Sequence, residues 1–215
     1  MDQQAEINMA LDYIGKNLVG RPTDIFALQR LLQSEFGEFG VKIDLNLDAD
    51  LRGCDVPVLS GYYEGGMSFM ADEDDEIEID IEIVLSYANT KIDFSQKDFE
   101  DFKFQFSRVL QHELIHRYQQ SRRGDKQQRD YKTSSKAKEY YGNADEIDAR
   151  AHDISLEITR NKCYNLLHNP REASLLTSET LFTYVVLFNS NSKVFKRLMK
   201  KVYQCINLPM CQWKS

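Results

Sequence analysis

Apolar residues near the start of the chain recur every three or four positions, the spacing of one face of a helix. One stripe predicts a helix over residues 3–19 that is closed by Gly20, and a second predicts a helix from Thr23 or Asp24 to Gly37. The stripes consist of Ile7, Leu11, Ile14 and Leu18, and of Ile25, Leu28, Leu31, Leu32 and Phe36. We expect both helices to be scaffold.

From residue 41 the period changes to two, which is typical of a strand with one buried face. Residues 41–47 and 56–63 are predicted strands, and Gly65-Gly66 turns the chain into a third at 67–71. The most regular alternation joins Ile77, Ile79, Ile81 and Ile83 with Glu76, Glu78, Asp80 and Glu82. We therefore expect a small, mostly antiparallel sheet within residues 41–88.

The last of these strands continues an acidic run. Eight of the eleven residues from Asp72 to Glu82 are Asp or Glu. Like charges along one strand face repel, so this face must be solvated or must meet cations. It is either a solvated face that prevents edge-to-edge aggregation or a docking surface for a basic partner.

Helical spacing returns after the sheet. Phe99, Phe102 and Phe106 predict a long helix over about residues 96–120, and Ser95-x-x-Asp98 resembles its start signal. The following segment, residues 121–138, is basic and nearly free of apolar residues, which is typical of an exposed loop.

Three more helices are predicted beyond that loop. The stripe Ile147, Ala151, Ile154 and Ile158 indicates a helix with Asn143 as its N-cap. From Ser174 the pattern predicts an apolar helix that includes Leu175 and Leu176, and then a basic helix with Val194, Leu198 and Val202 on its apolar face. The helices on either side of the basic loop would thus span residues 96–160 and the C-terminal helices residues 174–206, within one domain over residues 1–215.

Composition fits a soluble globular protein. The 215 residues are 42% hydrophobic and 28% charged, and the formal net charge of -7 argues against nucleic-acid binding as the main role. The acidic start resembles no secretory leader, and no stretch reaches the length of a membrane span, so we expect a cytoplasmic protein without membrane attachment. The four cysteines contain no C-x-x-C pair and are expected to be free thiols.

The chemistry lies in one segment, Gln111-His112-Glu113-Leu114-Ile115-His116, which contains H-E-x-x-H. On a helix, His112 and His116 lie one turn apart and can bind one ion, and Glu113 points to one side of them. A catalytic zinc takes three protein ligands and a water, and a neighbouring carboxylate accepts the proton of that water. The motif therefore supplies two ligands and a base.

A third ligand is expected downstream, on the helix after Asn143. Its first turns offer Glu146, Asp148 and His152. Position along the helix does not decide among them, so all three remain candidates at this point.

The H-E-L-I-H segment, followed about thirty residues later by Glu146-Ile147-Asp148-Ala149, resembles the gluzincin-type zinc metallopeptidases. It is most similar to the short intracellular ImmA/IrrE-like and phage-encoded ones. The resemblance covers about residues 96–158. It implies an α+β zincin-like fold, zinc bound by His112, His116 and Glu146, Glu113 as general base, and an exposed strand before the metal helix that aligns an extended peptide.

The sequence departs from that family in one respect. Thermolysin-like gluzincins carry an acid four residues after the ligand Glu, and Arg150 stands there, so a carboxylate that orients a histidine would have to be Asp145, Asp148 or Asp153. A donor for the oxyanion is also needed. The candidates are Tyr118, Tyr140, Tyr141, Arg150, His152 and His168, and the position of Tyr141 before the ligand helix favours it.

These patterns predict a cytoplasmic zinc-dependent endopeptidase that acts on a protein or peptide, in the host cytoplasm if it is phage-encoded. Two alternatives remain open. One is a catalytically silent zincin-fold binding protein that engages a partner through its acidic strand and basic loop. The other is metal-assisted hydrolysis of a nonpeptide substrate.

Overall fold

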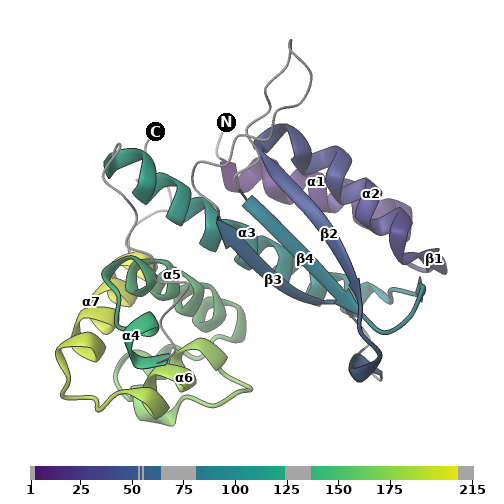
Figure 1. The fold of residues 1–215 in the computed structure, drawn as a ribbon. Coiled ribbons are helices and arrows are strands. Elements are labelled where there is room, and N and C mark those ends of the chain that lie inside the picture. Colours follow the sequence, from purple (N-terminus) through teal and green to yellow (C-terminus); the bar gives the residue numbers. More distant parts are fainter. Residues whose placement is uncertain (1–2, 53, 55, 64–80, 124–136, 208–215) are drawn as a thin grey trace. The chain divides into compact units, whose positions relative to one another are not determined.

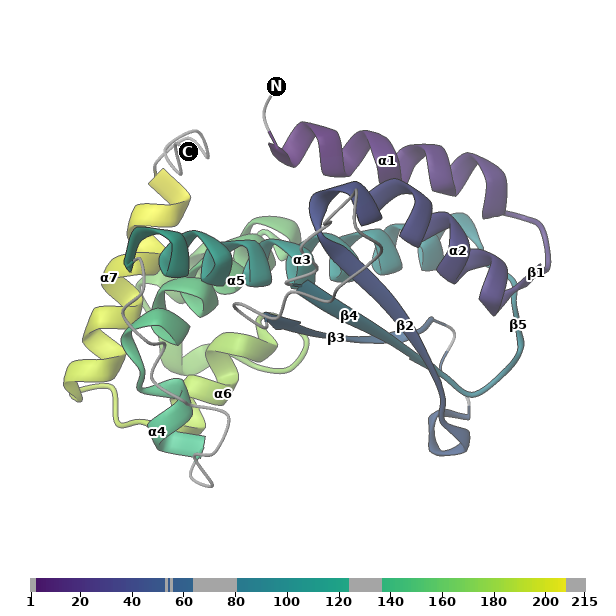
Figure 2. The same ribbon diagram turned by 45° about the horizontal axis from the view of Figure 1, so that its top comes forward.

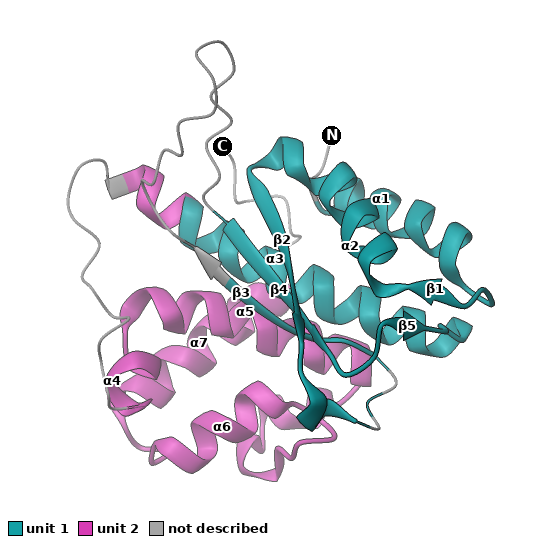
Figure 3. Cartoon of the chain, turned by 45° about the vertical axis from the view of Figure 1, so that its right-hand side comes forward, with its two compact units in different colours: residues 1–117 teal, residues 118–215 magenta. Residues whose placement is uncertain are grey.

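The computed structural model describes residues 3–52, 54, 56–63, 81–123 and 137–207 (Figure 1). The chain divides into two compact units, residues 1–117 and residues 118–215 (Figure 3). The fold is α+β, mostly helical, with two small sheets, both in the first unit. None of the described helices is long and apolar enough to span a membrane.

The first unit begins with the two predicted helices, α1 (Gln3–Leu18) and α2 (Ile25–Phe36). The two-residue strand β1 (Thr23–Asp24) lies between them. Asp24 starts α2 as its N-cap, because its Oδ1 accepts a hydrogen bond from the backbone N of Phe26 at 2.8 Å. Apolar stripes of both helices are buried in one core, as predicted.

A three-stranded sheet follows, in the order β2-β4-β3 (Figure 2). It consists of β2 (Val41–Leu47), β3 (Val58–Tyr63) and β4 (Ile81–Tyr87). The β3–β4 pair is antiparallel, but β2 and β4 run parallel, so this sheet is mixed and the expected antiparallel arrangement holds for only part of it. The hydrophobic pattern could not show this, because it fixes which face of a strand is buried and not the strand's direction. β1 and β5 (Lys91–Ile92) form a separate antiparallel pair.

Helix α3 (Gln96–Arg123) packs its aromatic face against the sheet. Ser95 Oγ accepts a hydrogen bond from the backbone N of Asp98 at 3.2 Å, which confirms the predicted start. The core joins Phe99, Phe102 and Phe106 of α3 to alternate residues of β4. The strand has an apolar face because its apolar residues alternate, and the helix has one because its apolar residues recur every three to four positions. These two faces pack together in the core.

Several predictions fall on residues outside the described ranges: the strand at 67–71, Ile77, Ile79, most of the acidic run and the basic loop from 124 to 136. The described end of the acidic run does meet a cation. Lys42 Nζ lies 3.4 Å from Oε1 of Glu82 and 2.7 Å from Oδ2 of Asp44. A hydrogen bond with Asp44, followed by burial, raises the pKa of Glu82 above its usual value.

The second unit is helical. After the last turns of α3 it contains α4 (Ala137–Tyr141), α5 (Ala144–Asn161), α6 (Glu179–Leu187) and α7 (Lys193–Asn207). Asn143 caps α5 as predicted, with its Oδ1 accepting from the backbone N of Asp145 at 3.1 Å. The stripe from Ile147 to Ile158 packs in a core against α6 and α7.

One helix prediction was wrong at its start. α6 begins at Glu179, so Leu175 and Leu176 lie outside it and are 66% and 91% exposed. Ser178 sets this boundary, because its Oγ accepts a hydrogen bond from the backbone N of Leu181 at 3.2 Å. The two leucines look like part of a helix stripe in the sequence, but the cap starts the helix after them.

Candidate metal centre

The two histidines of the motif face one another along α3. Their Nε2 atoms lie 3.2 Å apart, and their rings are nearly perpendicular. Two imidazole nitrogens bound to one tetrahedral zinc at its usual bond length would be separated by about 3.3 Å. The pair therefore already has the spacing that a shared metal ion requires.

Glu113 of the same motif is buried against β3. A Cβ on Gly61 would come within 2.9 Å of Glu113 Cγ, 3.0 Å of its Oε1 and 2.6 Å of Cγ1 of Val109. A side chain at position 61 would collide with both residues, so glycine permits this close approach of strand and helix. No role was predicted for Gly61, although a glycine inside a strand pattern is a signal of such a contact.

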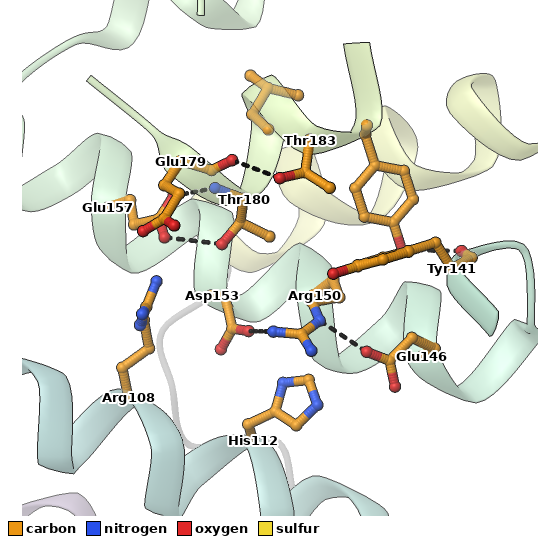
Figure 4. A network of polar contacts seen from close by, with 12 residues as sticks. Arg108, His112, Tyr141, Glu146, Arg150, Asp153, Glu157, Glu179, Thr180 and Thr183 are labelled. Atoms are coloured by element: carbon orange, nitrogen blue, oxygen red, sulfur yellow. Dashed lines mark hydrogen bonds and ion pairs between the residues drawn. The ribbon is translucent and has the colours of Figure 1, made fainter. Parts of the chain in front are cut away.

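Glu146 lies in the first turn of α5 and is 3% exposed. Its Oε1 accepts a hydrogen bond from Nε of Arg150 at 2.6 Å, and Nη1 of Arg150 lies 3.2 Å from Oδ2 of Asp153 (Figure 4). A carboxylate has two oxygens and about four lone-pair sites, so the bond to Arg150 does not use up its capacity as a ligand. Arg150 thereby holds the candidate ligand in a fixed orientation.

Arg150 is the residue that departs from the gluzincin pattern. Burial lowers the pKa of its guanidinium, but the charges of Glu146 and Asp153 outweigh burial and raise the pKa above its usual value. The guanidinium therefore stays charged beside both acids. The family pattern does not predict that Arg150 pairs with Glu146. The two residues are four apart on one helix, however, and this is the spacing of a helical ion pair.

Both tyrosines before α5 lie beside the charged pair of Glu146 and Arg150. Burial raises the pKa of Tyr140, and the charge of Glu146 raises it further, so its hydroxyl stays protonated. Tyr141, the residue that the sequence favours as oxyanion donor, accepts a hydrogen bond at its backbone oxygen from Tyr184 at 2.9 Å. The guanidinium of Arg150 lies 5.7 Å from the centre of the Tyr141 ring.

The other candidate residues lie in different settings. Asp148 forms ion pairs with α7, at 3.7 Å to Arg197 and 3.3 Å to Lys201. His152 is buried on α5, Tyr118 stacks with Arg122 near the end of α3, and His168 is exposed. Asp148 therefore already has cationic partners, whereas Glu146 belongs, with His112 and His116, to the donor set that could hold a metal ion.

Comparison with known proteins assigns no family. No family model matches the chain, and no curated protein or solved structure shows significant similarity to it. What points to a function is the site itself: two histidine nitrogens 3.2 Å apart, a buried glutamate beside a glycine, and a carboxylate hydrogen-bonded to an arginine.

Proposed function

We propose that the chain is a zinc-dependent endopeptidase in which His112, His116 and Glu146 bind the metal and Glu113 is the general base. The observation that carries the proposal is the 3.2 Å separation of the two Nε2 atoms. Two imidazoles and one carboxylate form a donor set that suits zinc and leaves a fourth position for water. The donor set therefore fits the metal that the motif implies.

A hydrogen bond in the second unit joins the last turns of α3 to the start of α5. Gln119 lies on α3 three residues after His116, and its Nε2 donates to the backbone oxygen of Asp145 at 3.2 Å. Residues three apart on a helix lie on the same side, and Asp145 immediately precedes Glu146. Within the second unit, this bond joins the end of α3 to the turn that carries Glu146.

The chemistry follows from the roles of the side chains. A bound zinc supplies a Lewis acid that polarises the peptide carbonyl and makes its water more acidic. Glu113 accepts the proton of the attacking water and passes it to the leaving amine. The contact with Gly61 holds Glu113 for this task, and Arg150 holds Glu146.

The peptide would align along β3. The strand expected to do this, β4, is paired with β2 and β3, whereas β3 has one neighbouring strand in the described sheet. An extended peptide can add to such an edge through backbone hydrogen bonds. Because Gly61 lies on β3 against Glu113, a peptide paired there would run beside the base.

Metal analysis of the purified full chain tests the site before any substrate is known. Wild-type protein loaded with zinc and freed of excess metal should retain one zinc per chain. His112→Ala and Glu146→Ala should lose most of it, whereas His168→Ala, a change at an exposed histidine, should retain it. Zinc retained by both ligand variants would overturn the assignment.

Activity is tested separately with Glu113→Gln. This variant should keep its zinc and lose cleavage of a mixed peptide library by a factor of about 10² to 10⁴, the usual contribution of a general base. Cleavage at the wild-type rate by the zinc-loaded variant would show that Glu113 is not the base. Zinc binding without cleavage by wild type would instead favour the catalytically silent alternative.

A further inference from the structure

A cavity of about 460 Å³ lies wholly in the second unit, apart from the residues of the proposed zinc site. It opens to solvent and is lined by α4, the segment around Arg171, the C-terminal end of α6, the turn that follows it and the start of α7. Its lining consists of Lys138, Arg171, Val185, Val186, Leu187, Phe188, Asn189, Ser190 and Phe195. The volume is that of a typical small-ligand site.

The lining combines positive charge with apolar walls. Lys138 and Arg171 contribute two cations, and none of the lining residues is acidic. Phe195 is buried in the helical core and forms part of the apolar wall, whereas Val186 is 66% exposed. A ligand that fits this lining carries a negative charge beside an apolar group.

Arg171 is hydrogen-bonded to another residue of the lining. Its Nη2 donates to Oγ of Ser190 at 2.5 Å. A guanidinium has five N–H donors, so this bond fixes the plane of the group and leaves further donors for a carboxylate. Oδ1 of Asn189 accepts a hydrogen bond from the backbone N of Asn191 at 3.0 Å, and its Nδ2 can donate to a peptide carbonyl.

We propose that this cavity binds the free C-terminal residue of a peptide that ends in an apolar side chain. Arg171 and Lys138 hold the terminal carboxylate, the side chain packs against Val185 and Phe188, and Asn189 contacts the last peptide group. The proposal does not depend on zinc or on peptidase activity. A free monocarboxylic acid shares the charge and the apolar group, and the experiment separates the two sources.

The test is titration of the metal-free full chain with acetyl-Ala-Leu-Phe, followed by the backbone amide NMR signals of residues 185–190. We expect saturable shifts with a dissociation constant below about 1 mM, the affinity of a small, specific ligand. The same peptide with an amidated C-terminus should bind at least about tenfold more weakly, because it cannot form charge-assisted hydrogen bonds. 4-Phenylbutyrate, which lacks the peptide groups, should also bind more weakly than the peptide acid.

Variants at exposed positions locate the site without risk to the fold. Arg171→Gln should weaken binding of the peptide acid about tenfold, and Lys138→Gln should weaken it severalfold. Lys200→Gln is the matched control, because it removes an exposed cation of the same unit that does not line the cavity. It should leave the affinity unchanged within twofold.

Three results would overturn the proposal. They are equal binding of the acid and amide peptides, loss of binding in Lys200→Gln as large as in Arg171→Gln, and no saturable shift up to about 10 mM peptide. Tighter binding of 4-phenylbutyrate than of the peptide acid would reassign the cavity to free carboxylic acids. Repeating the titration with Glu146→Ala keeps this outcome separate from that of the zinc site, since the cavity should be unaffected.

Discussion

The two units carry opposite charges and present their candidate ligands by different means. Residues 1–117 contain 10 Lys and Arg against 24 Asp and Glu, whereas residues 118–215 contain 17 against 10. The first unit sets its histidines with the period of one helix and packs Glu113 against Gly61. The second sets Glu146 with a buried ion pair to Arg150. The first arrangement depends on steric fit and the second on charge, so substitutions should affect them differently.

The largest effect is expected in the second unit, at Arg150. Arg150→Gln leaves the buried carboxylates of Glu146 and Asp153 without their cation, which should lower the free energy of unfolding by about 3 kcal/mol. Zinc affinity should fall as well, because Glu146 loses its orientation. Urea denaturation and zinc titration measure the two effects.

Arg197→Gln is the control for this change. Its ion pair with Asp148 is long, at 3.7 Å, and half exposed, so its loss should cost less than about 1 kcal/mol. Equal costs for the two arginines would show that the charge pair at Glu146 has no special structural role.

In the first unit the corresponding change is steric. Gly61→Ala places a methyl group against Val109 and Glu113 and should destabilise the chain by about 2 kcal/mol, the usual cost of overpacking. If Glu113 is displaced, cleavage should fall while zinc stays bound. Arg150→Gln, in contrast, is expected to weaken zinc binding. Val58→Ala, at an exposed position of the same strand, should change stability by less than about 0.5 kcal/mol.

The N-caps of α2 and α5 allow the same change, loss of a capping side chain, to be compared in the two units. Asp24→Ala in the first unit and Asn143→Ala in the second each remove one side-chain acceptor and should each cost about 1 kcal/mol by thermal denaturation. Only Asn143→Ala should also weaken zinc binding, because it frees the turn that carries Glu146. A loss of zinc affinity in both variants would indicate a general effect of lower stability.

The smallest effect is expected on the acidic sheet face. The pKa of Glu82 is raised in the fold, so folding favours its protonated form, and ionisation at neutral pH costs stability. Glu82→Gln should therefore stabilise the chain by a few tenths of a kcal/mol at pH 7, discounted for solvent screening. The gain should vanish as pH falls below about 4.3, the usual pKa of Glu, because Glu82 is then protonated in both states. A gain that persists at low pH would contradict this cause.

The sequence by itself determined what repeats along the chain. The stripes of α1, α2 and α5 and the caps at Asp24, Ser95 and Asn143 were confirmed, because spacing and local hydrogen bonding decide them. The alternation of β2 was confirmed at Val41 and Ile43, whereas Leu47 is exposed. The spacing of His112 and His116 belongs to the same class, since four residues on a helix place both rings on one side.

Tertiary structure alone decided what depends on distant residues. The parallel pairing of β2 with β4, the contact of Gly61 with Glu113 and the cations around Asp148 join segments far apart in the sequence. The ion pair of Glu146 and Arg150 joins residues only four apart in the sequence, but its importance for stability comes from the burial of Glu146. Periodicity records which face of an element is apolar, but the partner of that face, and the charge left inside, are set by packing.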